Sequence, residues 1–356
     1  MSAKIASKTN FLKKRIGEDL YAIKQKRAST LQKLVSLSEI TSPVSEDLIS
    51  VERHIVEQLS SDVKIIKTMG EYLISAGGKK LRPITLLLAT KALNYRGTDH
   101  ITLAAVIELI HTATLIHDDV VDKSQLRRGK ETINEVWGNA ASVLVGDFVY
   151  SRSFEMMVTV NRLRVMEIMA STTNAIAEGE VMQLYHANLP QIDEQAYLAT
   201  IQRKTARLFQ AATQLAAILA GADAASEAAL IAFGFNIGLA FQISDDLLDY
   251  SQKPTTIGKN PGDDLADGKC TLPLIHALKN ASNSSKKLIR TAIENGDRTK
   301  FNDILEIIES TGSVKYASKR SIEFAETAKS HLGILPDSIF RKALLELADF
   351  SARRIY

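Results

Sequence analysis

Two aspartate clusters with the same internal spacing lie 127 residues apart (245 − 118 = 127), at 118–122 and 245–249. Each reads Asp-Asp-x-x-Asp and is embedded in apolar sequence. Residues four positions apart share one face of an α-helix, so the outer aspartates of each cluster point the same way when both segments are helical. Carboxylates this close repel one another unless a cation compensates their charge, and hard divalent cations prefer oxygen ligands. The clusters therefore predict two facing helices that form a polynuclear magnesium site for a diphosphate.

A single cluster of this kind is more often a solvated helix face or a cap than a metal site, because most charged side chains are exposed. The flanking residues argue against that interpretation here. They are apolar around both clusters: Leu115, Ile116, Val120 and Val121 for the first, and Ile243, Leu247 and Leu248 for the second. A free surface helix would have polar flanks, so both segments are expected in the interior.

Helical periodicity dominates the chain from about Ser45 onwards, and strand signals are nearly absent. Short breaks rich in Gly, Asn, Asp or Pro separate the expected helical segments, which are 81–94, 101–122, 140–159, 164–186, 195–221 and 224–251. The longest break, 253–269, is expected to be a loop. The pattern predicts an all-α fold with one helical domain over residues 31–356, preceded by a polar basic arm over residues 1–30.

Composition limits the classes of function. A formal net charge of +3, without a basic stripe interleaved with aromatic residues, argues against nucleic-acid binding. Cys270 is the single cysteine, which favours a reducing compartment. No uninterrupted apolar run reaches the roughly 18 residues that cross a bilayer, so no transmembrane segment and a cytoplasmic location are expected. The basic residues near the N-terminus could form an organellar presequence, although Glu18 and Asp19 favour a polar arm.

Basic residues accompany the aspartate clusters. The segment 77–83 reads Gly-Gly-Lys-Lys-Leu-Arg-Pro at an expected helix start, where glycines and basic side chains favour phosphate; the spacing is not that of a P-loop. His111 precedes Asp118 by two helical turns and shares its face. Arg127 and Arg128 follow the first cluster. Acidic faces for magnesium, together with basic groups for phosphates without metal, are what a reaction between two diphosphate substrates needs.

Seven motifs, in one order, resemble those of the trans-polyprenyl (trans-isoprenyl) diphosphate synthases over roughly residues 45–356. They are GGKKLRP at 77–83, HTATLIHDDVVD at 111–122, RRG at 127–129, GD at 146–147, KT at 204–205, FQISDDLLD at 241–249 and GKNPGDDLADGKCTLP at 258–273. The resemblance implies an isoprenoid synthase fold, a single bundle of about ten or more helices around a deep central cavity, usually as a homodimer. It also implies a prenyltransferase that condenses isopentenyl diphosphate onto an allylic diphosphate with about two to three Mg²⁺ ions.

The resemblance also assigns roles to residues. The isopentenyl diphosphate would be bound by Lys79, Arg82, His111 and Arg128. The allylic diphosphate would be contacted by Arg127, Lys204, Thr205, Gln242, Lys259 and Lys269. Within this second set, the catalytic residues would be Lys204, Thr205 and Gln242, the last two placing oxygens near the allylic cation. Magnesium would be held directly by Asp118, Asp122 and Asp245, with further or water-mediated ligands at Asp119, Asp246 and Asp249.

Product length should depend on Ala113 and Thr114, which lie five and four positions before the first aspartate. In this family these positions help to set chain length. Both residues are small, so a growing chain should pass them. Phe148 could supply the far floor of the cavity, although ordinary core packing is the more common reason for such a residue. The small side chains predict a long product, and the resemblance implies about eight to ten isoprene units, as in precursors of quinone side chains.

Three alternatives remain open from the sequence. The chain could make a shorter product, such as farnesyl or geranylgeranyl diphosphate. It could be a non-catalytic subunit of a heteromeric synthase, although such subunits usually lose one aspartate cluster. A terpene cyclase also uses Asp-Asp-x-x-Asp, but its second metal motif normally mixes Asn, Ser or Thr with Glu, whereas 245–249 reads Asp-Asp-Leu-Leu-Asp.

Overall fold

The structure, a computed structural model, describes residues 35–75, 77–250 and 261–353. The chain divides into two compact units, Met1–Glu39 and Ile40–Tyr356, and the helical bundle belongs to the second. The boundary expected between residues 30 and 31, and the arm before it, lie outside the described residues. So does Lys259. The expectations about them stay predictions.

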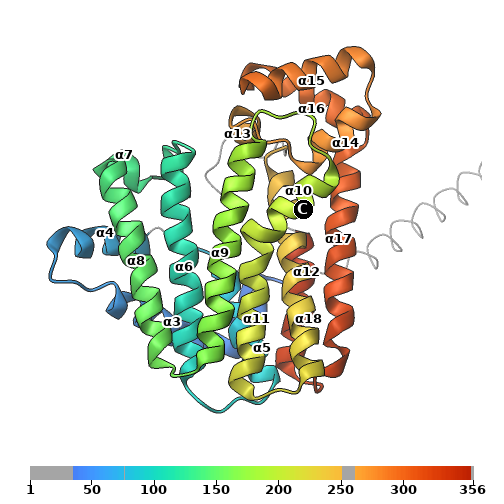
Figure 1. The fold of residues 1–356 in the computed structure, drawn as a ribbon. Helices are drawn as coiled ribbons and strands as arrows, with labels where there is room; N and C mark the ends of the chain where they lie inside the picture. The colour runs from blue at the N-terminus through green and yellow to red at the C-terminus, as the bar shows by residue number, and fades with distance from the viewer. Residues whose placement is uncertain (1–34, 76, 251–260, 354–356) are drawn as a thin grey trace, which may run out of the picture. The chain divides into compact units, whose positions relative to one another are not determined.

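Helices form nearly all of the regular structure in the described residues (Figure 1). In chain order they are α2 (Leu37–Thr41), α3 (Ser45–Gln58), α4 (Lys64–Ser75), α5 (Leu81–Ala92), α6 (Asp99–Val121), α7 (Ile133–Trp137), α8 (Asn139–Thr159), α9 (Leu163–His186), α10 (Glu194–Ile201), α11 (Arg207–Ala220), α12 (Ala224–Leu248), α13 (Asp263–Ala266), α14 (Leu272–Asn280), α15 (Asn283–Asn295), α16 (Phe301–Ser310), α17 (Ser313–His331) and α18 (Ile339–Ala352). A short antiparallel pair, β1 (Leu126–Arg127) and β2 (Lys130–Glu131), follows α6. The predicted all-α fold is confirmed.

The long helices pack side by side, with α6 against α8, α11 against α9 and α12, and α12 against α17 (Figure 1). The inner helix α5 is buried almost all round, as its apolar sequence requires. Helix α12 begins after Asp223, whose carboxylate accepts the backbone N–H of Ser226 at 2.7 Å. Helices α14, α15 and α16 form a smaller group with its own apolar core, which includes Leu274, Ile289 and Ile304.

The expected helix over 195–221 is interrupted by a π-helical turn, Gln202–Ala206, between α10 and α11. Two glycines make room for it. A Cβ on Gly179 of α9 would lie 2.5 Å from the backbone nitrogen of Lys204, and one on Gly238 of α12 would lie 2.5 Å from the Cα of Ala206. π-Turns inside helices often mark functional sites. This one carries Lys204 and Thr205.

Another difference from expectation lies in the segment 253–269. Its described part contains the short helix α13 and is therefore not a continuous loop. Helix α13 begins at Asp263, where the carboxylate of Asp249 accepts the backbone N–H groups of Gly262 and Asp263 at 3.1 and 3.2 Å. A carboxylate at a helix N-terminus satisfies donors that have no partner within the helix. The second aspartate cluster thus fixes the start of α13.

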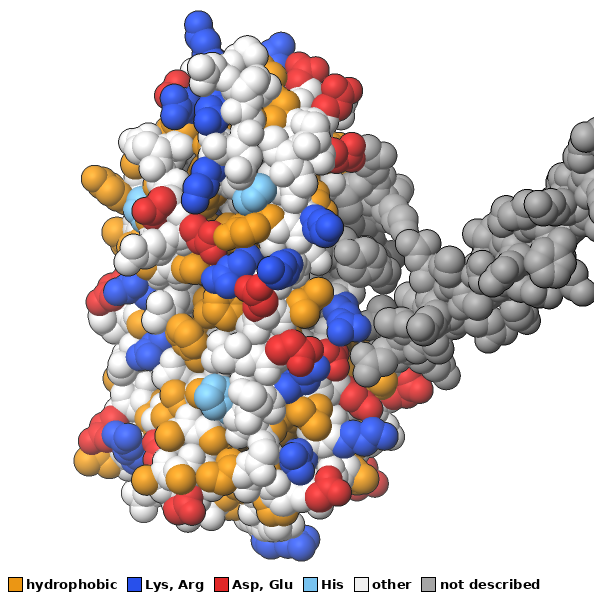
Figure 2. All heavy atoms as spheres, turned by 90° about the vertical axis from the view of Figure 1, so that its right-hand side faces the viewer, with side chains coloured by type: hydrophobic (Ala, Val, Ile, Leu, Met, Phe, Trp, Pro, Cys, Tyr) orange, Lys and Arg blue, Asp and Glu red, His pale blue; other side chains and the backbone are white. Residues whose placement is uncertain are grey.

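Two helices in the described part of the chain, α6 and α12, are long and apolar enough to cross a membrane. The apolar window of α6 is 56% buried and that of α12 is 39% buried. A core helix of a globular bundle meets the same criteria, so the expected absence of a transmembrane segment stays a prediction. On the face drawn in Figure 2, basic and acidic side chains are interspersed with small apolar areas.

Candidate active site

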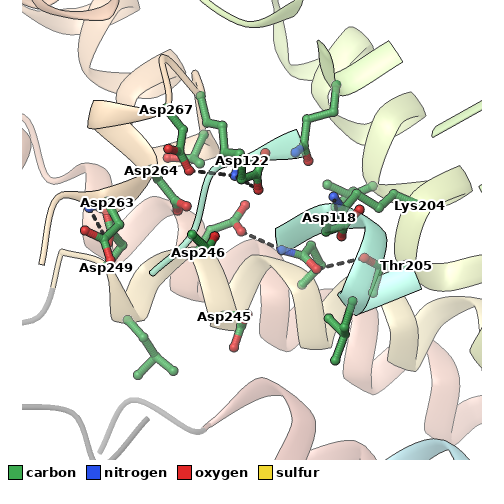
Figure 3. Close-up of a pocket in the computed structure, with 18 of the residues that line it drawn as sticks. Asp118, Asp122, Lys204, Thr205, Asp245, Asp246, Asp249, Asp263, Asp264 and Asp267 are labelled. Atoms are coloured by element: carbon green, nitrogen blue, oxygen red, sulfur yellow. Dashed lines mark hydrogen bonds and ion pairs between the residues drawn. The ribbon is translucent and has the colours of Figure 1, made fainter. Parts of the chain in front are cut away.

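A cavity of about 740 Å³ is lined by side chains from α5, α6, α9, α10, the π-turn, α12 and α13. Both aspartate clusters reach it (Figure 3). The basic group predicted to bind phosphate also lines it. Segments far apart in the sequence therefore meet at one place. The predicted site residues that line the cavity are Lys79, Arg82, His111, Thr114, Asp118, Asp122, Arg127, Arg128, Lys204, Thr205, Gln242, Asp245, Asp246, Asp249 and Lys269.

The outer aspartates of the first cluster face the cavity from the end of α6. Asp118 accepts a hydrogen bond from Lys204 Nζ at 3.2 Å, and Asp122 accepts one from Lys269 Nζ at 2.9 Å. Asp119 does not line the cavity. Its buried carboxylate binds Arg127 through hydrogen bonds of 2.7 to 2.9 Å. Burial raises the pKa of Asp119 although Arg127 opposes the shift. Its predicted part in metal binding stays a prediction.

The second cluster comes from the end of α12. Burial, followed by the negative charge of Asp264, raises the pKa of Asp246 to about 7. Asp246 accepts hydrogen bonds from the Tyr197 hydroxyl at 2.6 Å and from Gln242 Nε2 at 2.7 Å. Figure 3 shows Asp249 beside Asp263. The negative charges of Asp246 and Asp264 interact in a buried place, and such an arrangement favours a cation between them.

Each lysine that binds the first cluster is also held by a second carboxylate. Lys204 Nζ donates to Glu180 at 2.5 Å, and Lys269 Nζ donates to Asp267 at 2.8 Å. Burial alone would lower the pKa of Lys269, but Asp122, Asp264 and Asp267 raise it instead. Burial also raises the pKa of Glu180 to about 7, against the opposing effect of Lys204. Both lysines are positioned to exchange a carboxylate for a phosphate oxygen.

The donor set fits magnesium, which usually takes one or two carboxylates and completes its shell with water and substrate phosphates. Asp118, Asp122, Asp245, Asp246 and Asp249 offer hard oxygen ligands around one cavity. Within the described residues no three acidic, histidine or cysteine side chains converge into a metal site by themselves. The two lysines supply the compensating charge for Asp118 and Asp122 in this arrangement. A magnesium ion here would take its remaining oxygen ligands from water or from a bound anion.

The basic group lies in the same cavity. The Arg82 guanidinium stands 4.7 Å from the centre of the Phe209 ring, which fixes its direction. Burial, and then the charges of Arg82 and Arg128, lower the pKa of His111 well below its usual value. This shift favours the neutral imidazole, which donates one hydrogen bond. These side chains suit an anion that is bound without metal.

Several residues near this basic group have strained backbone angles. Lys80, Lys123 and Arg128 all have left-handed backbone angles, with φ values of 47°, 51° and 54°, and all three line the cavity. Such angles cost energy in residues other than glycine and tend to persist where function requires a particular direction. Gly78 leaves room for the Arg128 guanidinium, because a Cβ at residue 78 would lie 2.6 Å from Arg128 Nη1.

Sequence reasoning missed several cavity residues, and some of them lie in a spacing pattern that could have identified them. Asp263–Asp267 repeats the Asp-Asp-x-x-Asp spacing a third time, yet the segment was expected to be a loop. Glu108 precedes His111 by one turn, and its buried carboxylate faces Arg82 and Arg128, although burial raises its pKa. Nothing local in the sequence distinguishes the other missed residues, Glu180 and Tyr197.

Of the three residues expected to set product length, one lines the cavity and two do not. Thr114 lines the cavity, whereas Ala113 is fully buried and does not line it. Phe148 lies on α8, outside the lining, and the Arg152 guanidinium stands 5.2 Å from its ring centre. Phe148 therefore packs beside Arg152. The roles of Ala113, Thr114 and Phe148 stay predictions.

Comparison with known proteins gives a consistent result. The family model described as polyprenyl synthetase matches residues 63–310. The octaprenyl diphosphate synthase of Escherichia coli (strain K12) is 47% identical over 321 residues, 90% of this chain and 99% of that protein. The all-trans-nonaprenyl-diphosphate synthase (geranyl-diphosphate specific) of Rhodobacter capsulatus is 43% identical, over 89% of this chain and 98% of its own.

A solved structure agrees. The polyprenyl synthase from Caulobacter crescentus CB15, complexed with calcium and isoprenyl diphosphate, superposes with a TM-score of 0.88 at 42% sequence identity. The match covers 91% of this chain and 100% of that chain. The resemblance, the isoprenoid synthase fold and the prenyltransferase class expected from the motifs are confirmed. This chain belongs to the polyprenyl synthetase family of prenyltransferases.

Proposed function

We propose that the chain is a magnesium-dependent, long-chain trans-polyprenyl diphosphate synthase. It adds isopentenyl diphosphate to an allylic diphosphate by repeated 1'-4 condensation. The observation that carries this proposal is the single cavity that both aspartate clusters and a separate basic group line. The carboxylates suit a diphosphate bound through metal, and the basic group suits a second diphosphate bound without it.

Asp118, Asp122 and Asp245 would hold the magnesium ions, with Asp246 and Asp249 close to them. Bound magnesium would neutralise the negative charge that grows on the departing diphosphate. The calcium and isoprenyl diphosphate in the Caulobacter crescentus relative support a divalent cation beside a diphosphate in this fold. Lys204 and Lys269 lie next to the same aspartates and would turn their ammonium groups towards the diphosphate oxygens.

The reaction follows from these charges. The allylic C–O bond breaks, its electron pair leaves with the diphosphate, and an allylic cation remains. The double bond of isopentenyl diphosphate attacks this cation to form a carbon–carbon bond, and loss of a proton to the released diphosphate restores a double bond. Thr205 and Gln242 line the cavity beside Asp246 and would place oxygens near the cation. The buried walls would exclude water that would otherwise trap the cation.

Replacing Arg82 with alanine should raise the KM for isopentenyl diphosphate about 10- to 100-fold, because a charge-assisted contact to its diphosphate is lost. The KM for the allylic substrate should change by less than about threefold, since that diphosphate relies on the aspartate side of the cavity. Steady-state kinetics with each substrate varied in turn measures both values. Arg164→Ala, a half-exposed residue on α9 paired with Glu167, is the control. A main defect in the allylic substrate would contradict the division into two sites.

The long product is supported by the relatives. Those with high identity are named for octaprenyl and nonaprenyl products. The small side chain of Thr114 on the cavity wall fits passage of a growing chain. We therefore propose a product of about eight to ten isoprene units, used as a precursor of quinone side chains. The single cysteine, Cys270, supports our proposal of a cytoplasmic location.

We also propose a homodimer. Exposed apolar side chains gather where α6 ends, α8 begins and α9 ends: Val121, Val143, Leu144, Val181, Leu184 and Tyr185. Helices α6, α8 and α9 lie next to one another (Figure 1). Exposed apolar side chains on neighbouring helices often mark a protein interface, and a second copy of the chain brings a matching surface.

Replacing Leu144, which is 68% exposed, with aspartate should shift the protein from dimer to monomer, because a charge cannot be buried unpaired in an apolar interface. Size-exclusion chromatography with light scattering measures the mass. Ile339→Asp, at the start of α18 and 63% exposed, is the matched control and should leave the mass unchanged. A wild-type protein that is monomeric at micromolar concentration would refute the dimer.

One experiment separates an active synthase from a non-catalytic subunit or a cyclase. The purified chain alone is incubated with farnesyl diphosphate, labelled isopentenyl diphosphate and magnesium, with chelator in a parallel sample. A synthase transfers the label into a longer linear diphosphate only when magnesium is present. A subunit without activity incorporates no label, and a cyclase releases a hydrocarbon without using isopentenyl diphosphate.

A further inference from the structure

A chain of three hydrogen bonds runs from α10 to the π-turn through α12. The Tyr197 hydroxyl donates to Asp246 Oδ2 at 2.6 Å, and Gln242 Nε2 donates to Asp246 Oδ1 at 2.7 Å. Thr205 Oγ1 donates to Gln242 Oε1 at 2.8 Å. Figure 3 shows the part of this chain between Asp246 and Thr205. All four side chains line the cavity.

The direction of each bond follows from the donors and acceptors. Each oxygen of Asp246 accepts a hydrogen bond, one from the Tyr197 hydroxyl and the other from the NH₂ side of the Gln242 amide. The oxygen of that amide must then face Thr205, and the Thr205 hydroxyl must donate to it. A hydroxyl that has spent its one hydrogen in this way presents lone pairs elsewhere. Thr205 thereby offers partial negative charge to the cavity, where an allylic cation would form.

We propose that Tyr197 is a positioning residue for this reaction: it fixes Asp246, and through Gln242 it fixes the hydroxyl of Thr205 with its lone pairs towards the cavity. The inference rests on the proposed function. Tyr197 does so from a rigid place, because only 5% of it is exposed and its ring packs among Ile201, Leu239 and Ile243. The Tyr197 hydroxyl makes the hydrogen bond to Asp246, and the packed ring holds the side chain in place.

Loss of the Tyr197 hydroxyl would release one oxygen of Asp246 and allow its carboxylate to turn. The Gln242 amide would then lose the constraint on its orientation. In the reversed orientation its NH₂ group faces Thr205, and the Thr205 hydroxyl hydrogen turns into the cavity. A hydrogen directed at the cation raises the energy of ionisation, whereas lone pairs lower it. The defect should therefore appear in turnover and spare the binding of isopentenyl diphosphate.

The test is Tyr197→Phe, which removes only the hydroxyl and keeps the ring. We expect kcat to fall about 10- to 100-fold, as for loss of a hydrogen bond to a charged group, with the KM for isopentenyl diphosphate within about threefold of wild type. The control is Tyr316→Phe on α17, whose hydroxyl donates to Glu194 at 2.6 Å outside the cavity. Replacement of Tyr197 by 4-aminophenylalanine, which keeps an N–H donor, should restore much of kcat. This variant also tests the role of the donor if the phenylalanine variant folds poorly.

A second readout needs no activity and no metal. Thermal unfolding in chelator is compared for Tyr197→Phe, Thr205→Val and the double variant. Effects at sites that act independently add, whereas two ends of one hydrogen-bond chain do not. We expect the double variant to lose less stability than the sum of the single losses. Additive losses, or a Tyr197→Phe enzyme with the kcat of the Tyr316→Phe control, would overturn the inference; an inactive wild-type enzyme would instead refute the proposed function.

Discussion

Replacing Asp118 with alanine should lower the rate of polyprenyl diphosphate formation by about 100- to 1000-fold or more at saturating substrate. Asp118 lines the cavity, is only partly buried and accepts a hydrogen bond from Lys204. Its loss would remove a proposed magnesium ligand near the end of α6, where Asp122 also lies. The charge on the leaving diphosphate would then be less well stabilised. Initial rates with labelled isopentenyl diphosphate, over a range of magnesium concentrations, measure the effect.

The fold should survive this substitution, because Asp118 takes no part in the apolar core. Lys204 also keeps Glu180 as a partner when Asp118 is absent. Asp337→Ala, at a fully exposed residue, is the matched control and should keep both activity and melting temperature. An Asp118→Ala enzyme with near-normal rates at millimolar magnesium would show that the first aspartate cluster is not the metal site.

Replacing Thr114 with phenylalanine should shorten the product to about three or four isoprene units while the first condensations continue. Thr114 lies on the cavity wall one helical turn before Asp118, so the diphosphates and metal would be bound beyond the new ring. A packed wall does not absorb an aromatic ring without strain, so the ring occupies the path of the growing chain. Chromatography of the dephosphorylated products measures their length.

Thr114→Val is the matched control for this experiment. It keeps the volume of the side chain and removes only the hydroxyl, which donates to the backbone oxygen of His111 at 2.8 Å. Product length should therefore stay as in the wild type. An active Thr114→Phe enzyme that still makes the full-length product would remove residue 114 from the elongation path. Ala113 is fully buried off the lining, so a ring there tests the family expectation less directly.

The sequence predicted what depends on local periodicity. The spans of α6, α9 and α12 follow from apolar residues at helical spacing, and the same spacing predicts the outer aspartates of each cluster on one face. Helix geometry also explains why Asp119 differs. Neighbouring residues are rotated by about 100° around the axis, and Asp119 accordingly turns from the cavity to Arg127.

What the sequence did not predict depends on contacts between distant segments. The π-turn that carries Lys204 exists because α9 and α12 approach it at Gly179 and Gly238. Glu180 matters only because Lys204 is folded against it, and Tyr197 only because its hydroxyl reaches Asp246 on another helix. Such pairs share no local spacing, so single-sequence reasoning has no signal for them.

The most direct test of the account is the length of the product made by the wild-type chain alone. The protein is incubated with magnesium, farnesyl diphosphate and excess isopentenyl diphosphate, and the polyprenyl diphosphates are analysed by mass spectrometry. The account predicts an all-trans series that ends at about eight to ten isoprene units and disappears when magnesium is removed. A product that stops at three or four units, or no product at all, would contradict it.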